Sequence, residues 1–243
     1  SGPDLGALRH ATTTFEQLGA IWASGTVALT GDGDPEQLRA ALVTTNFFDV
    51  LGTPSAFGRT FRTDDSAPGA PPTVLIGWDL FQRRFGGDPS VVGRQILVDD
   101  LPTTVIGVMP QAFRLLLPLD ASVPDHLQVW APFWPDLEHG PRGNLFLRVV
   151  GRMRPGVTVA EASAEIDGIA RSLPPDLGAA RAFQTIALQA DDVREVRAPL
   201  FVLFAGVAIL LTLGCVNVPS LLIARAASRA REPAVRIALG ASR

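Results

Sequence analysis

Three histidines and three pairs of adjacent aspartates are the residues of this chain whose types suit metal binding or acid–base catalysis. His10, His126 and His139 are scattered, and none has the spacing that places two imidazoles on one face of a helix. The aspartate pairs fall in predicted turns or flanks, where carboxylates are well solvated, so we expect surface residues rather than catalytic acids and bases. The pairs are Asp64-Asp65, Asp99-Asp100 and Asp191-Asp192.

Motifs for nucleophilic catalysis and nucleotide binding do not occur in the sequence. Neither G-x-S-x-G nor G-x-x-x-x-G-K-[ST] is found, so this chain is expected to hydrolyse no nucleotide by itself. Cys215 is the only cysteine and lies in an apolar run, which excludes a disulfide framework within the chain and a cysteine metal cluster. We therefore predict that the chain is not an enzyme and has no catalytic residue, cofactor or metal site.

One aromatic cluster is a further candidate for binding. Trp130, Phe133 and Trp134 could line a ligand cleft, or they could pack into a hydrophobic core. The sequence favours core packing, because large aromatic side chains dominate the energetics of protein interiors.

The most unusual feature of the chain is an uncharged apolar run near its carboxyl end. Residues 198–224 are 27 residues without Asp, Glu, Lys, Arg or His. As a helix they would extend roughly 40 Å, which exceeds the roughly 30 Å hydrocarbon core of a bilayer. A buried core helix of this length would show a polar face, and none appears before Asn217. The run therefore predicts a transmembrane helix over 198–224.

Charge is distributed unevenly about this run. Residues 225–243 contain five arginines and one glutamate, a net charge of +4, whereas the rest of the chain carries −7. The positive-inside rule places 225–243 in the cytoplasm and 1–197 outside the cell membrane. The amino terminus does not read as a signal peptide, so an upstream membrane segment is expected and the chain reads as a fragment. No broad basic face is predicted, which argues against nucleic-acid binding.

The 197 residues before the run read as a mixed α and β body. Thr158 and Glu161 form a T-x-x-E capping box before an apolar pattern of helical period. Asn46 is expected to cap a short helix that Gly52 ends, and an Asp99-Asp100 turn is expected inside a hairpin. Predicted strands are 19–31, 37–44, 72–78, two within 94–110, one short strand within 118–141, 144–156 and 183–189; predicted helices are 46–52, 79–87 and 158–173.

Several stretches together resemble one family. "LVTTNFFDVLGTPSAFGRTF", "VLIGWDLFQRRFGGDPSVVGRQILVDD" and "TTVIGVMPQAFR" look like the extracytoplasmic domain of MacB-type (FtsX-like) ABC transporter permeases. "LRVVGRMRPGVTVAEASAEI" resembles the closing strand and helix of that domain. "GCVNVPSLLIARAASRAREPAVRIALGASR" is similar to the second membrane helix of the family and the cytoplasmic segment behind it.

The resemblance implies an α+β extracytoplasmic domain over 1–197, with a porter-like part and an inserted subdomain at roughly 46–141. One transmembrane helix (198–224) and a cytoplasmic coupling segment (225–243) would follow. The family's permeases have four membrane helices and pair with a cytoplasmic ABC ATPase subunit, as a homodimer or pseudo-dimer. The implied function is efflux of macrolide- or peptide-like substrates, driven by ATP hydrolysis in the partner.

Three groups of residues are candidates for this role. Asn217, Ser220 and Ala224 form a stripe of small or polar residues that could pack on other membrane helices, and Pro219 should kink the helix. Arg225, Arg229 and Arg231 would meet anionic lipid where the helix leaves the membrane. Candidates for coupling to the ATPase are Arg231, Glu232, Pro233, Arg236, Leu239 and Gly240.

An alternative function belongs to a different class. FtsX-like proteins transmit the state of an ATPase to hydrolases outside the cell and move no solute, so a signalling or scaffold role fits the same sequence. A membrane-anchored enzyme is a third reading, and no set of residues supports it.

Overall fold

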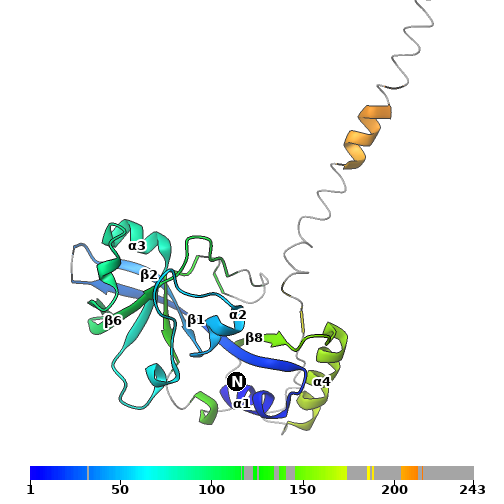
Figure 1. Ribbon diagram of the computed structural model, residues 1–243, viewed down its shortest axis with the longest axis horizontal. Helices are drawn as coiled ribbons and strands as arrows, with labels where there is room; N and C mark the ends of the chain where they lie inside the picture. Colours follow the sequence, from blue (N-terminus) through cyan, green and yellow to red (C-terminus); the bar gives the residue numbers. More distant parts are fainter. Residues whose placement is uncertain are drawn as a thin grey trace, which may run out of the picture. The chain divides into compact units, whose positions relative to one another are not determined.

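The structure is a computed structural model of the 243-residue chain, drawn in Figure 1. It divides into two compact units, residues 1–188 and 189–243. Within them the structure describes residues 1–31, 33–115, 117, 123–124, 126–133, 137–140, 146–173, 185–186, 188, 204–212 and 215.

The first unit combines helices and strands in an α+β body. Its α-helices are α1 (Gly2–Ala11), α2 (Phe47–Leu51), α3 (Trp78–Phe85) and α4 (Val159–Ser172). Its 3-10 turns are η1 (Thr63–Ser66), η2 (Pro89–Val91) and η4 (Leu137–His139). Its strands are β1 (Phe15–Thr30), β2 (Glu36–Val43), β3 (Phe57–Gly58), β4 (Thr73–Ile76), β5 (Gln95–Val98), β6 (Leu101–Val108), β7 (Val129–Pro132) and β8 (Arg148–Met153).

Six strands close into a ring in the order β1–β2–β7–β4–β6–β5 and back to β1. The pairs β2–β7 and β4–β6 are parallel, and the other four are antiparallel. β3 pairs with β6 outside the ring. The result is a small closed barrel, which removes the exposed edges that an open sheet would have.

Strand β1 pairs with strands of the barrel and also with β8, which lies outside the barrel. Ile21–Leu29 pair with β2 along one edge, while Phe15–Ile21 pair with β8 and Leu29–Thr30 with β5 along the other. The register shifts by one residue between Ala23 and Gly25. Gly25 adopts a φ of +98°, which a side chain would disfavour, so this bulge lets one strand leave the barrel and continue beside β8.

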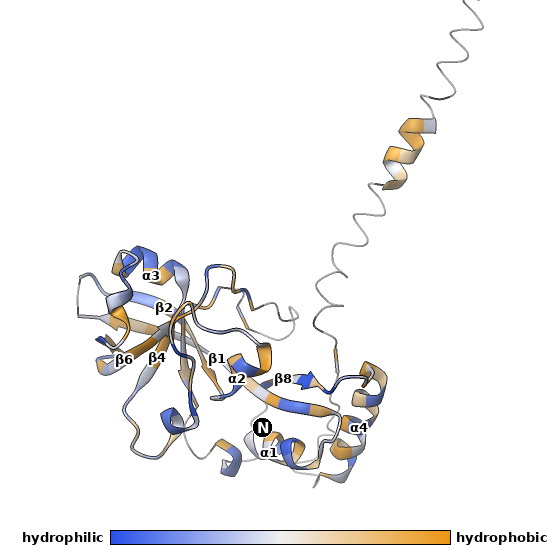
Figure 2. Ribbon diagram, viewed as in Figure 1, coloured by the Kyte–Doolittle hydropathy of each residue, from blue (hydrophilic) through white to orange (hydrophobic). Residues whose placement is uncertain are grey.

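Alternating side chains divide the barrel strands between two cores, following the two-residue repeat of a strand. Ala40, Val74 and Val129 belong to one cluster, in which Leu80 and Phe81 of α3 pack against Ile76, Val108 and their neighbours. Helix α3 thus covers the barrel end where β4 and β6 finish. Residues next to these on the strands, such as Ala41, Leu75 and Trp130, join a second cluster with α2. Figure 2 shows the apolar colouring along β4 and β6.

Most local predictions for this body are confirmed. Thr158 and Glu161 form the reciprocal capping box of α4. Gly52 ends α2 and Gly86 ends α3, both in the left-handed conformation. Asp99 and Asp100 have φ values of +49° and +61° in the turn between β5 and β6. Within 118–141 the described residues contain the one short strand expected, β7.

Three predictions need correction or extension. The Asn46 side chain does not cap α2; its amide donates to Leu18 O at 3.1 Å, and its oxygen accepts from Arg9. Strand β1 begins at Phe15, four residues earlier than predicted. Of the predicted strand 183–189, the described residues 185, 186 and 188 do not lie in a strand.

Helix α1 was not predicted, because Gly2 and Gly6 give its sequence poor helix propensity. Its glycines have a packing reason. A Cβ on Gly2 would collide with Leu137 O, and one on Gly6 would lie 2.9 Å from Glu138 Oε2. Close approach of the η4 backbone therefore requires a glycine at Gly2. Burial of Leu5 and Leu8 stabilises the helix despite its glycines.

The Arg9 side chain joins α1 to its surroundings. Its guanidinium donates to Leu18 O at 3.1 and 3.0 Å, to Glu138 Oε1 at 2.5 Å and to Asn46 Oδ1 at 3.2 Å. One cation therefore links α1, β1, η4 and the residue before α2.

The second unit is described at 204–212, which is helical, and at Cys215. Its apolar side chains are exposed; Leu210 and Leu211 are each 69% accessible. Among the described residues, no helix combines the length and apolar character needed to cross a bilayer. The rest of the predicted span 198–224 lies outside the described residues, so the span remains a prediction, as does the division of the body into a porter-like part and an inserted subdomain.

Helix α4 is attached to the start of β1 by one carboxylate. Glu165 accepts hydrogen bonds from the Thr12, Thr13 and Thr14 hydroxyls and from the Thr13 and Thr14 amides. Burial raises the pKa of the Glu165 carboxyl, but the hydrogen bonds from the three threonines lower it by more, so its pKa lies well below the ordinary value.

We expect Glu165→Gln to lower the free energy of unfolding at pH 7 by about 1–2 kcal/mol, because a neutral amide accepts these bonds less well. Since the folded-state pKa is depressed, this stabilisation is present above the ordinary glutamate pKa and declines as the pH falls below it. Urea unfolding from pH 7 to pH 3 should therefore show a smaller gap between Glu165→Gln and wild type at low pH. Asp167→Asn, which removes one carboxylate from the same helix, is the control. An equal loss of unfolding free energy in both variants would contradict a specific role for Glu165.

Candidate functional site

The residues predicted to pack in the membrane or to couple to an ATPase are not in the described part of the chain. Asn217, Pro219 and Ser220 lie outside it. The coupling candidates Arg231, Glu232, Pro233, Arg236, Leu239 and Gly240 lie outside it as well. Their roles remain predictions.

The three histidines lie on different parts of the fold, in α1, in the segment before β7 and in η4. His10 Nδ1 lies 2.7 Å from Gly6 O within α1, and His126 and His139 are exposed. Among the described residues, no group of three or more His, Cys, Asp or Glu side chains could hold a metal ion.

Two of the aspartate pairs have structural roles. Asp99 Oδ1 accepts from Ala28 N at 2.7 Å and Asp100 Oδ1 from Thr30 Oγ1 at 3.0 Å, so the turn between β5 and β6 is tied to β1 where the barrel closes. The Asp65 carboxylate accepts hydrogen bonds from both terminal nitrogens of Arg59, at 2.6 and 2.8 Å. The third pair, Asp191-Asp192, lies outside the described residues.

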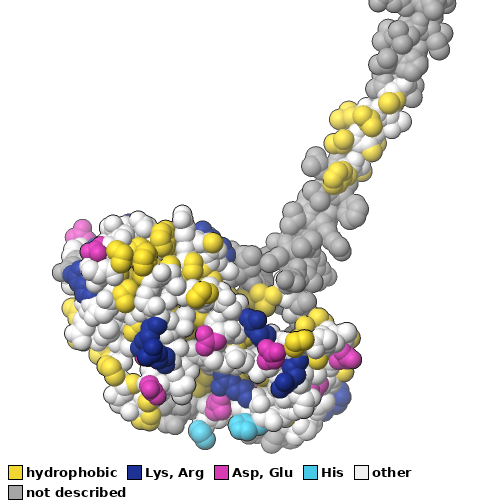
Figure 3. Space-filling view, in the orientation of Figure 1, with side chains coloured by type: hydrophobic (Ala, Val, Ile, Leu, Met, Phe, Trp, Pro, Cys, Tyr) yellow, Lys and Arg dark blue, Asp and Glu magenta, His cyan; other side chains and the backbone are white. Residues whose placement is uncertain are grey.

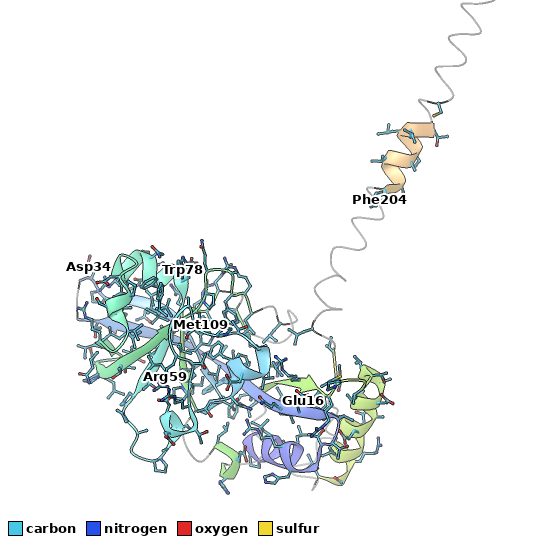
Figure 4. All side chains as sticks on the ribbon, in the orientation of Figure 1. Glu16, Asp34, Arg59, Trp78, Met109 and Phe204 are labelled. Carbon is cyan, nitrogen blue, oxygen red and sulfur yellow. The ribbon has the colours of Figure 1, made fainter. Side chains whose placement is uncertain are left out.

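The Arg59–Asp65 ion pair holds the loop that leads from β3 to β4. Burial raises the pKa of the Asp65 carboxyl, but hydrogen bonds from Arg59 and the Arg62 amide outweigh it and the pKa is lowered. Ser66 Oγ donates to Phe133 O at 2.8 Å. These contacts place the residues from Asp65 to Pro72 beside β7 and β4. Arg59 is labelled in Figure 4.

Between this loop and the strand ends lies a hollow of about 620 Å³, which we call the barrel mouth. Its walls come from this loop and from six strands, and most of the strand side chains that line it are apolar. The strand residues lining it are Ser24, Val27, Ala40, Ala41, Leu42, Thr73, Val74, Val98, Leu101, Thr103 and Val129 to Pro132. Phe133 and the residues of the loop complete it.

The aromatic cluster at β7 is part of the core, as the sequence favoured. Trp130 and Phe133 are each 3% exposed. The Trp130 ring packs on Phe48 and Phe113, with centroids 5.9 and 5.8 Å away. Both residues also border the barrel mouth, so the two readings of this cluster are compatible. Trp134 lies outside the described residues.

Two buried polar atoms in the described part of the chain lack a hydrogen-bond partner, Thr73 Oγ1 and Trp130 Nε1. Thr73 is 7% exposed, and both residues border the barrel mouth. Buried polar groups without partners are rare and costly. The sequence could not identify them, because the strands that surround the mouth are spread over more than a hundred residues.

A second, more polar cleft of about 410 Å³ lies at the start of α3. Trp78 and Met109, labelled in Figure 4, line it, together with Arg39, Arg114 and His126. The Arg114 guanidinium donates to the carbonyls of Gln111 and Phe113 in its own loop. On the face of the body in Figure 3, basic and acidic side chains are interspersed and form no single basic patch.

Two solved structures show that this fold occurs in other proteins. The extracellular domain of the noncanonic ABC-type transporter YknZ from Gram-positive bacteria has a TM-score of 0.54 and 18% identity, covering 76% of this chain and 87% of that one. The periplasmic region of MacB from Actinobacillus actinomycetemcomitans has a TM-score of 0.52 and 16% identity, covering 70% and 72%. At these identities the likeness shows the fold.

Sequence comparison then gives the family. Residues 2–169 match the MacB-like periplasmic core domain, so the chain belongs to this family. A relative from Chromobacterium violaceum, named macrolide export ATP-binding/permease protein MacB, is 29% identical over 199 residues, which are 81% of this chain and 29% of that protein. The chain spans about 29% of the length of the curated relatives that it matches. The resemblance read from the sequence is therefore confirmed.

Thr73 and Thr44 provide a matched test of the unpartnered hydroxyl. Both are buried, 7% and 6% exposed, but Thr44 Oγ1 accepts from Ala20 N at 3.0 Å. We expect Thr73→Val to leave the free energy of unfolding unchanged or raise it by up to about 1 kcal/mol, and Thr44→Val to lower it by about 1–3 kcal/mol. Urea unfolding measures both, and equal losses would mean that the Thr73 hydroxyl has a partner.

Proposed function

We propose that this chain is part of the permease of an ABC-type exporter. Residues 1–197 would form its extracytoplasmic domain, 198–224 would cross the cell membrane and 225–243 would reach the cytoplasm. The observation that carries the proposal is the order of features: a MacB-like periplasmic core domain over 2–169, then an uncharged apolar run, then a tail of net charge +4. That order suits a domain held outside a membrane.

ATP hydrolysis is expected outside this chain. The relative from Chromobacterium violaceum is named as an ATP-binding/permease protein, and this chain covers 29% of it. We propose a cytoplasmic ATPase partner, two permease copies or halves per transporter, and a movement of the extracytoplasmic domains when the ATPases dimerise. The substrate class, macrolide- or peptide-like, rests on the relative's name and is proposed on that basis alone.

A closed barrel is suited to a domain that moves as a rigid body. Each of its six strands is paired on two sides, and the clusters on either side of the strands are buried. A displacement applied at one point would therefore move the body as a unit, because well-packed interiors deform little.

Topology is tested by cysteine labelling of the full-length protein in cells. In a Cys215→Ser background, Ala160→Cys on α4 is exposed and should react with a membrane-impermeant maleimide while the cytoplasmic membrane is intact. Ala241→Cys in the tail should react only after lysis. The reverse pattern, or labelling of both in intact cells, would overturn the proposed orientation.

Coupling is tested by deleting residues 231–240 from the full-length permease and measuring ATP hydrolysis by the partner in lipid nanodiscs. We expect transporter-dependent ATPase activity to fall at least tenfold, because the segment predicted to contact the ATPase is removed. Val149→Ala, an exposed change on β8, is the control and should retain activity. Full activity after the deletion would place the ATPase contact elsewhere.

The signalling alternative makes a different prediction for the same strains. If the protein regulates extracytoplasmic hydrolases, loss of coupling should alter the activity of cell-wall enzymes and leave the flux of every tested solute unchanged. A change in resistance or efflux supports export.

A further inference from the structure

The cleft at the start of α3 presents two arginines that no acidic side chain neutralises. Arg39 of β2 and Arg114, in the segment after β6, line the cleft and are exposed to solvent. Among the residues that the structure describes, neither of these guanidinium groups forms an ion pair. Arg83 differs, because it lines the same cleft but pairs with Glu36. The cleft therefore carries positive charge that a bound anion can balance.

The Arg114 guanidinium is held in place while part of it stays available. Its Nη1 donates to Gln111 O at 3.1 Å and to Phe113 O at 3.0 Å. In the described part of the chain, its Nε and Nη2 groups have no partner. Those two nitrogens form the planar fork that binds both oxygens of one carboxylate. Because the loop already fixes the side chain, less conformational entropy is lost when an anion binds.

Backbone hydrogen bonds hold Arg39 beside the start of α3. Gln128 N donates to Arg39 O at 2.9 Å, and Gln128 Oε1 accepts from Arg39 N at 3.1 Å. The carbonyl oxygen of Gln128 accepts from the amide of Gly77, the residue before α3, at 2.7 Å. Gln128 thus ties β2 to the first residue of α3, Trp78, which forms a wall of the cleft. His126 also lines the cleft and can donate a further hydrogen bond.

The other walls are apolar and partly aromatic. Trp78 and Phe113 are half-buried, and Met109 and Leu127 are buried. All four line the cleft, and Trp78 and Met109 are labelled in Figure 4. The volume of about 410 Å³ lies within the roughly 300–1,000 Å³ that is typical of ligand pockets. An inorganic ion would leave most of this space and its apolar surface in water, whereas an organic acid with a ring would cover them.

The charges that line the cleft favour an anion with a single negative charge. Asp79, exposed in the first turn of α3, is also part of the lining. Because Glu36 neutralises Arg83, the remaining charges are two arginines and one aspartate, a net charge of +1 with His126 neutral. A carboxylate balances this charge. A phosphate monoester with two negative charges would exceed it and would be repelled by Asp79.

We propose that the cleft at the start of α3 binds a small organic carboxylate with an aromatic body. The carboxylate lies between the Arg39 and Arg114 guanidinium groups, and the ring lies against Trp78 and Phe113. The site belongs to the first unit of the structure and does not depend on the proposed function in export.

The test is photo-crosslinking of the full-length protein in phosphatidylcholine nanodiscs, with labelled peptides located by mass spectrometry. The probe is a benzoate that carries a trifluoromethyl diazirine in the para position. We expect saturable labelling of peptides from the cleft. Unlabelled 2-naphthoate should displace the probe at a concentration about tenfold lower than 2-naphthamide, its neutral counterpart, because hydrogen bonds to charged groups are the stronger ones. 2-Naphthyl phosphate should displace it less well than 2-naphthoate.

Four variants make the test specific to the cleft. Arg39→Gln and Arg114→Gln should each weaken binding of the probe about tenfold, because each removes a charged donor. Asp79→Asn should strengthen it about threefold, because it removes the negative charge that repels the carboxylate. Arg171→Gln is the matched control, since this exposed arginine lies on α4 and does not line the cleft. All four positions are exposed, and circular dichroism confirms that each variant is folded.

The outcomes separate this proposal from its rivals. Equal displacement by 2-naphthoate and 2-naphthamide, unchanged labelling in both Arg39→Gln and Arg114→Gln, or an equal loss in Arg171→Gln would overturn it. Loss of labelling when phosphatidylglycerol is added to the nanodiscs would identify a lipid phosphate as the occupant and would also overturn it. Deletion of 231–240 should leave cleft labelling unchanged, so failure of the coupling proposal and failure of this one are distinguishable.

Discussion

The architecture of the body depends on the pairing of β1 along both of its edges. Its second half closes the barrel through β2 on one side and β5 on the other, while its first half carries β8. The bulge at Gly25 lets one strand form both sets of pairs. Arg9 and Glu165 attach the start of β1 to α1 and α4. These hydrogen bonds hold the two helices against the strand that closes the barrel. The barrel mouth and the cleft at α3 are both lined by strands that this closure holds in place.

Much of the local structure was predictable, because its causes are local. The T-x-x-E capping box, the glycine that ends α2 and the two-residue turn at Asp99-Asp100 each depend on a few neighbouring residues. Helix α1 was missed for the opposite reason: its two glycines lower helix propensity and are explained only by the distant η4. Asn46 looked like a helix cap, but Arg9 and Leu18 provided its side chain with partners from elsewhere in the chain.

The candidate site shows where sequence reasoning ends. The sequence marked Trp130 and Phe133 as residues of interest and left two readings open. Only the strand order showed that they border a hollow to which β1, β2, β4, β5, β6 and β7 all contribute. The missing partner of the Thr73 hydroxyl is also invisible in a sequence, because satisfaction of a polar atom depends on every element around it. Family membership, in contrast, was readable directly from short motifs and was confirmed over residues 2–169.

The length of β1 has a mechanical consequence. Hydrogen bonds in an antiparallel ladder run perpendicular to the strands, so tension along β1 loads its bonds to β2 and β8 together rather than one after another. A strand loaded in this way resists extraction far better than one peeled from its end. Any load that acts along this strand would therefore be shared between the barrel and β8.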